Sequence, residues 1–151
     1  GFAMVALGVA RAGLDAAIEL AGGKKARGDQ DLLRDKPVIQ QQVGQAEAIW
    51  GSARSFLLDN ASGAWENACE TQALTLENLI RLRLASTNAI RMAAEVVDIA
   101  YNLCGSHAIF ADNPIQRRFQ DVHVITQQIQ GRLAHYERAG QFFLGLEPEG
   151  W

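Results

Sequence analysis

Hydrophobic residues recur at intervals of three and four along most of the chain, a spacing that places them on one face of a helix. Near the start, Arg11, Asp15 and Glu19 follow one another at intervals of four within an otherwise apolar stretch. They form one polar stripe on a helix that we predict over about residues 2–21, ended by the glycine pair that follows. A signal peptide or membrane span would not carry such a stripe, so we expect no membrane association.

Two longer helices are predicted next. Pro37 suits the first turn of a helix, and apolar residues at intervals of three and four continue from there toward Cys69. Thr75 is a predicted N-cap for a third helix over residues 76–104, which carries the most regular apolar pattern in the chain. Gly105 is expected to end that helix.

Two polar residues, Arg83 and Thr87, interrupt the apolar seam of the third helix. One interpretation is that the buried face of the helix rotates along its length. The other is that the two side chains face a ligand or a second subunit. The sequence leaves both open.

Turn-forming residues then fill residues 105–113, and the Asn113-Pro114 pair predicts a cap and first turn for a helix that continues to about Ile129. A last helix is predicted over residues 133–144. The polar connection over residues 24–36 is long for a helical bundle, which makes it a candidate functional loop. The predicted fold is all-α, an antiparallel up-down four-helix bundle with a short extra helix, forming a single domain over residues 1–151.

Composition and charge exclude several classes of function. The chain has 151 residues and a net charge of −3, which argues against a nucleic-acid binder. Its two cysteines form no Cys-x-x-Cys motif, and reduced cysteines suit a cytoplasmic protein. The three histidines lack metal-ligand spacing, no Glu-x-x-His pair supports a di-iron site, and no phosphate-binding glycine motif or nucleophile elbow is present. We therefore expect no metal site.

Three segments carry a family resemblance. They are residues 103–123 (LCGSHAIFADNPIQRRFQDVH), residues 34–43 (RDKPVIQQQV) and residues 136–148 (YERAGQFFLGLEP). Together they resemble the C-terminal bundle of the acyl-CoA dehydrogenase superfamily, in the branch of two-component flavin-dependent hydroxylases and monooxygenases. Members of that family carry a helical domain and a β domain before the bundle. Because the chain does not begin with Met, we expect it to be the C-terminal domain of a longer flavoenzyme.

The resemblance implies site residues. Arg27 matches an arginine that contacts the flavin phosphates, although Arg34 competes for that role. Gly105 and Ser106 match the small-residue turn that approaches the cofactor, and His123 matches a histidine suited to proton transfer.

The chain also departs from the family pattern. Members often carry a second histidine five positions after His123, where this chain has Gln128, which cannot act as a base near neutral pH. Arg117 and Asp121 match a charged family segment, and their spacing of four predicts an ion pair. The resemblance therefore leaves dehydrogenase and monooxygenase chemistry both open.

Cofactor and partners follow from the same resemblance. It implies FAD or FMN, a dimer or tetramer assembled through the bundle, and a partner flavin reductase for the parent enzyme. We expect the chain alone to be catalytically incomplete and to bind flavin without high affinity. The alternative is a stand-alone helical module for oligomerisation or small-ligand binding, without catalysis.

Overall fold

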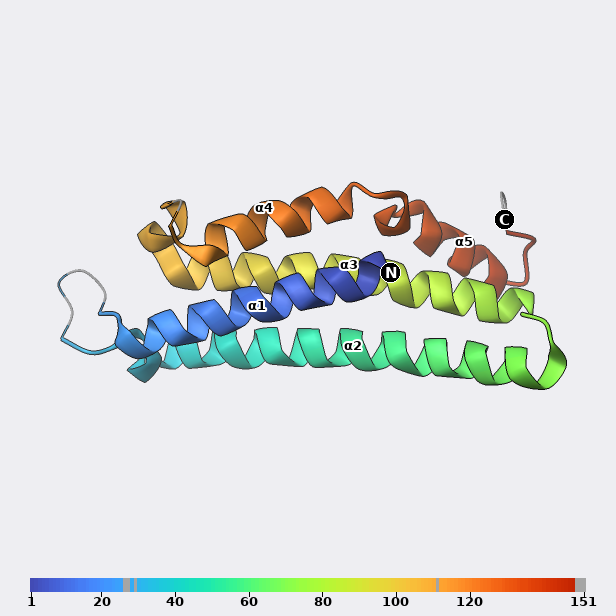
Figure 1. Ribbon diagram of the computed structural model, residues 1–151, viewed down its shortest axis with the longest axis horizontal. Helices are drawn as coiled ribbons and strands as arrows, with labels where there is room; N and C mark the ends of the chain where they lie inside the picture. Colours follow the sequence, from blue (N-terminus) through green and yellow to red (C-terminus); the bar gives the residue numbers. More distant parts are fainter. Residues whose placement is uncertain (26–27, 29, 111, 149–151) are drawn as a thin grey trace.

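The computed structural model describes residues 1–25, 28, 30–110 and 112–148, and within these ranges the fold is all-helical, as predicted (Figure 1). Among the described residues, no helix is both long and apolar enough to cross a membrane. The elements in chain order are α1 (Phe2–Gly23), η1 (Leu33–Asp35), α2 (Pro37–Thr71), α3 (Leu76–Cys104), η2 (Gly105–Ile109), α4 (Pro114–Thr126), η3 (Ile129–Gly131) and α5 (Ala134–Phe143).

The two longest helices form a hairpin. α2 has 35 residues and α3 has 29, and they run side by side in opposite directions on either side of a short turn (Figure 1). The turn ends α2 at Gln72, whose φ of 57° is left-handed, and starts α3 at Thr75. Thr75 Oγ1 accepts from the Asn78 amide at 3.1 Å, and Asn78 Oδ1 accepts from the Thr75 amide at 3.2 Å. The predicted cap is confirmed, and it is a reciprocal capping box.

α3 is the central helix, because it packs against α1, α2, α4 and α5. α1 lies beside the first half of α2, whereas α4 and α5 follow one another along α3 (Figure 1). Burial on α3 therefore spreads well beyond the single predicted seam, over Ile80, Ala85, Thr87, Ala89, Ile90, Ala93, Val96, Val97, Ala100, Leu103 and Cys104. Four of these residues are alanines, whose small side chains leave room for neighbouring helices on several sides.

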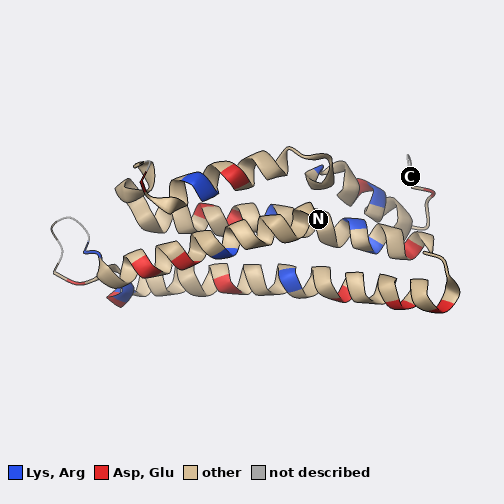
Figure 2. Ribbon diagram, in the orientation of Figure 1, with Lys and Arg blue, Asp and Glu red and all other residues tan. Residues whose placement is uncertain are grey.

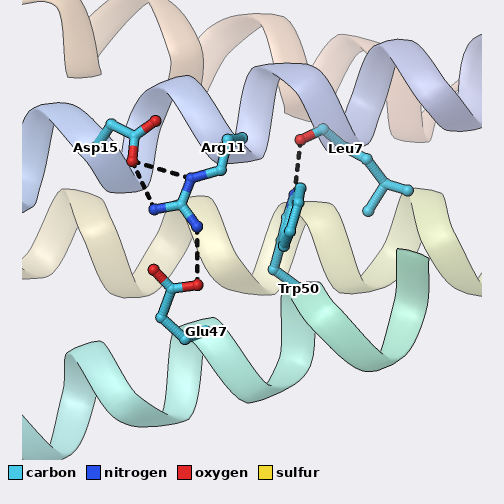
Figure 3. A network of polar contacts seen from close by, with 5 residues as sticks. All are labelled: Leu7, Arg11, Asp15, Glu47 and Trp50. Carbon is cyan, nitrogen blue, oxygen red and sulfur yellow. Dashed lines mark hydrogen bonds and ion pairs between the residues drawn. The ribbon is translucent and has the colours of Figure 1, made fainter. Parts of the chain in front are cut away.

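Polar contacts tie α1 to α2 (Figure 3). The Arg11 guanidinium donates to Asp15 on its own helix and, at 2.8 Å, to Glu47 on α2. These two carboxylates raise the pKa of Arg11 further above its ordinary value. One turn along α2, the Trp50 indole donates to the Leu7 carbonyl at 2.9 Å. Both charge signs are spread along the helices, with basic residues where α1 gives way to the long connection (Figure 2).

A buried polar junction joins α3 to the segment between α4 and α5. Thr87 is fully buried, and its hydroxyl donates to the Gln130 carbonyl at 2.8 Å and lies 2.9 Å from His135 Nδ1. The Arg91 guanidinium donates to the Gly131 carbonyl. The interpretation that Thr87 faces a ligand or second subunit is therefore wrong, since the chain itself covers this side chain.

Gly131 makes the junction possible. A Cβ there would lie 2.8 Å from the Thr126 carbonyl oxygen and 3.2 Å from Ile90 Cγ2. The chain thus stays against α3 after Thr126, and α4 ends three residues before the predicted Ile129. Burial, with a smaller effect of Arg83, lowers the pKa of His135.

Candidate functional site

A cleft of about 430 Å³ opens where α1 and α3 both end. It contains the predicted contact residues Gly105 and Ser106. Lys24, Lys25, Leu33, Ile39, Asn102, Leu103 and His107 complete its lining. Residues far apart in the sequence therefore meet at one end of the molecule.

Gly105 gives this cleft its turn. Its φ is 54°, a left-handed conformation that L side chains rarely adopt, and its amide donates to the Asn102 carbonyl as α3 ends. The backbone then enters the single turn of η2 with Ser106 exposed. The predicted end of the third helix is confirmed, and the turn presents backbone and a hydroxyl without a bulky side chain at its first position.

Lys24 is tied to the same turn. Its ammonium donates to the Cys104 carbonyl, the last of α3, at 2.8 Å. A Cβ on Gly105 would lie 3.9 Å from Lys24 Nζ, so the ammonium and the turn are in contact distance. The Lys24 carbonyl accepts from the Leu33 amide at 2.8 Å, and Lys25 forms an isolated β-bridge with Leu32. Both ends of the long connection are thereby pinned to each other.

Of the two arginines implied by the resemblance, the structure describes only Arg34. Arg27 lies outside the described residues. Arg34 lies in η1 and lines a neighbouring apolar cleft of about 390 Å³, with its Nε 3.8 Å from an Asp35 carboxylate oxygen. It does not line the Gly105 cleft.

A second cleft of about 560 Å³ lies alongside the first. The two share Lys24 and His107, and the second adds Glu19 and Asn113, whose side chain caps α4 by accepting from the Ile115 amide at 3.0 Å. Together the paired clefts bring two ammonium groups, an imidazole, a hydroxyl and a glycine turn to one place, with the Glu19 carboxylate confined to the second cleft. Such a donor set, beside a backbone that no side chain covers, fits an anionic phosphate ligand.

His123 lies elsewhere, on the outer part of α4, and lines none of these three clefts. Its Nδ1 is 2.8 Å from the Phe119 carbonyl, and its Nε2 is 3.4 Å from an Asp98 carboxylate oxygen on α3. The ring also stacks on Phe119 with centroids 4.3 Å apart. His123 is thus half-exposed but oriented from both nitrogens, and Asp98 is a partner that no sequence motif marked.

The charged segment on α4 is present as an ion-pair cluster. Asp121 lies 3.8 Å from Arg117 and 3.7 Å from Arg118, so the predicted pair is confirmed and shared with a second arginine. Among the described residues, no three His, Cys, Asp or Glu side chains are grouped closely enough to hold a metal ion.

Comparisons with known proteins identify the family and the fold. Residues 1–131 match the model of the family described as acyl-CoA dehydrogenase, C-terminal domain. Indole-3-acetate monooxygenase from Pseudomonas putida is 36% identical over 145 residues, covering 96% of this chain and 37% of the relative. The oxygenase component of an FADH2-dependent resorcinol hydroxylase from Rhizobium is 25% identical, covering 98% and 38%. The chain thus spans little more than a third of these relatives.

Solved structures show the same fold. XiaF from Streptomyces, in complex with FADH2 and glycerol, superposes with a TM-score of 0.92 at 20% identity, covering 99% of this chain and 38% of XiaF. The HsaA monooxygenase from M. tuberculosis superposes with a TM-score of 0.86 at 21% identity, with the same coverage.

Proposed function

The chain belongs to the acyl-CoA dehydrogenase C-terminal domain family, and on that premise we propose that it is the C-terminal domain of a flavin-dependent monooxygenase. Two relatives, at 36% and 32% identity, are indole-3-acetate monooxygenases and cover 96% of this chain, whereas a putative acyl-CoA dehydrogenase from Bacillus subtilis, also 32% identical, covers 77%. The fuller matches favour monooxygenase over dehydrogenase chemistry. The observation that carries the proposal is the Gly105 cleft, whose lining suits a flavin nucleotide phosphate.

Within that cleft, Gly105 and Ser106 would approach a phosphate of FAD or FMN, Gly105 with uncovered backbone and Ser106 with a hydroxyl donor. Arg27 remains a proposed third contact. A bound reduced flavin supplies the activation of dioxygen and the transfer of one oxygen atom to the substrate. The chain's own contribution is to bind and orient the nucleotide end of the cofactor.

For His123 we propose proton transfer at Nε2. The Phe119 carbonyl accepts from Nδ1–H, which leaves Nε2 as the nitrogen that gains or loses a proton. Asp98, 3.4 Å away, would hold that nitrogen toward the α3–α4 surface. A reacting group would have to enter between Nε2 and Asp98, and both side chains are exposed enough to permit this.

Assembly is part of the same proposal. α1, α2, α3 and α4 would form an up-down four-helix bundle, with α5 as the extra helix, and one such domain would occupy the whole of residues 1–151. The bundle would support a homodimer or homotetramer of a cytoplasmic enzyme supplied by a flavin reductase. The Rhizobium relative, an oxygenase component, supports such a partner.

Flavin titration of the 151-residue chain tests the function. We expect FAD to bind with low affinity and to shift amide resonances at Gly105 and Ser106, because the cleft supplies only part of a cofactor site. Sedimentation analysis measures assembly in the same samples. A chain that oligomerises but shows no response to any flavin would instead be a stand-alone helical module, and the proposal would be wrong.

A further inference from the structure

Lys24 occupies an unusual position at the end of α1. It is the C-cap residue of that helix, and its side chain reaches across to the last carbonyl of α3, 80 residues later in the chain. Lys24 also lines both clefts at this end of the molecule. One side chain therefore joins two helix ends to the candidate site.

Electrostatic attraction favours the position of the Lys24 ammonium at the end of α3. A cation at the C-terminus of a helix interacts favourably with the partial negative charge of its last carbonyls. The effect of this ammonium also extends to its surroundings. Burial raises the pKa of the Cys104 thiol, and the Lys24 charge opposes that rise. The Lys24 ammonium thus acts electrostatically on the residues at the Gly105 turn.

The same ammonium can donate to more than one acceptor. An ammonium carries three N–H donors, and among the described residues the Cys104 carbonyl is the acceptor of one of them. Its backbone is also held, because the Lys24 carbonyl accepts from the amide of the buried residue Leu33. The contact with the Cys104 carbonyl already restricts the Lys24 side chain. Part of the conformational entropy that a long side chain loses on binding is therefore lost before any ligand arrives.

We propose that Lys24 binds a phosphate oxygen of the flavin nucleotide while it caps α3, and so couples nucleotide binding to the stability of the Gly105 turn. This inference rests on the proposed function. An anion in the cleft holds the ammonium in place, and the ammonium in turn holds the Cys104 carbonyl. Lys25 also lines the cleft, but its side chain is exposed, so we expect it to contribute less than Lys24.

Nuclear magnetic resonance titrations of the full chain test this proposal with FAD, FMN and riboflavin, which has no phosphate. The main variant is Lys24→Gln, which keeps an N–H donor for the Cys104 carbonyl but removes the charge. Lys24→Arg retains the charge, and Lys25→Gln is the matched control with the same change in net charge. Circular dichroism and thermal unfolding confirm that each variant folds.

We expect Lys24→Gln to weaken FAD and FMN binding about tenfold, the size of one charge-assisted contact, and Lys25→Gln to weaken it about twofold. Lys24→Arg should stay close to wild type. In wild type, but not in Lys24→Gln, FAD should slow hydrogen exchange of the amides at the end of α3. A preference for FAD over FMN would support recognition of a diphosphate, and equal binding would support recognition of a single phosphate.

Other outcomes overturn the inference. Equal affinity of wild type and Lys24→Gln would refute it while the proposed function stands, and so would riboflavin binding as tightly as FMN. No response of the wild-type chain to FAD, FMN or riboflavin would refute the proposed function, and this inference with it.

Discussion

Gly131 offers the sharpest test of how α3 holds the end of α4. In Gly131→Ala, the new methyl group would lie 2.8 Å from the Thr126 carbonyl oxygen, closer than real Cβ contacts occur, and 3.2 Å from Ile90 Cγ2. The first neighbour is backbone and the second belongs to a fully buried side chain, so neither moves cheaply. Overpacking of this kind costs about 1–3 kcal/mol. The shift would also strain the contact between Arg91 and the Gly131 carbonyl.

The matched control is Gly63→Ala in the interior of α2. A Cβ at Gly63 meets nothing within 4 Å, and alanine is favoured over glycine inside a helix by about 0.5–1 kcal/mol. The same chemical change should therefore destabilise at one position and stabilise at the other. Urea denaturation followed by circular dichroism measures both free energies of unfolding. Gly131→Ala as stable as wild type would show that the junction is not tightly packed.

Three further predictions address other contacts. Burial lowers the pKa of His135 in the folded chain, so the unfolded chain takes up this proton first as the pH falls. The free energy of unfolding should therefore have its full value above about pH 6.5 and decrease toward pH 5 by at most about 1.4 kcal/mol per pH unit. His135→Gln should flatten that slope in urea denaturation at several pH values. Glu47→Gln should cost about 0.5 kcal/mol, since its ion pair with Arg11 is partly exposed, and 1 M NaCl, about the strength that screens such pairs, should abolish the difference. Thr75→Ala should cost about 1 kcal/mol in the same assay, whereas Thr75→Ser should remain near wild type.

Local chemistry explains which parts of the fold the sequence could predict. The start of α2 at Pro37, the cap at Thr75 and the end of α3 at Gly105 each depend on residues within one helical turn. Helical period likewise located α1 and α3 within a few residues. These features need no knowledge of the rest of the chain, and the structure confirms them.

Tertiary contacts explain what the sequence could not predict. Thr87 looked exceptional on an apolar seam because its partners, Gln130 and His135, lie 43 and 48 residues away. The early end of α4 accompanies the close approach of Gly131 to the Thr126 carbonyl, which helical periodicity did not locate to within three residues. Buried polar residues of this kind become intelligible only when their hydrogen-bond partners are known.

The candidate site likewise has one feature that local sequence predicts and one that depends on a tertiary contact. Gly105 was predictable as a turn from its place after a long helix, and the structure adds that its φ of 54° disfavours any other residue. The contact of Lys24 with the Cys104 carbonyl spans 80 residues, so the sequence showed only a lysine beyond a helix end. The turn of the cleft was therefore predictable from local sequence, whereas the position of its Lys24 charge depends on a long-range contact.

His123 shows why residue type alone is weak evidence for catalysis. A general base needs a nitrogen that a substrate can reach, yet Nδ1 already faces the Phe119 carbonyl and Nε2 faces Asp98. An imidazole between two acceptors serves both only when both nitrogens carry protons, a form that donates protons rather than accepting them. Within the proposed proton transfer, the geometry of His123 therefore favours the role of acid, or of a base only after Asp98 moves aside. The Gly105 turn needs no such rearrangement, so flavin binding is the part of the proposed function that this chain's geometry supports most directly.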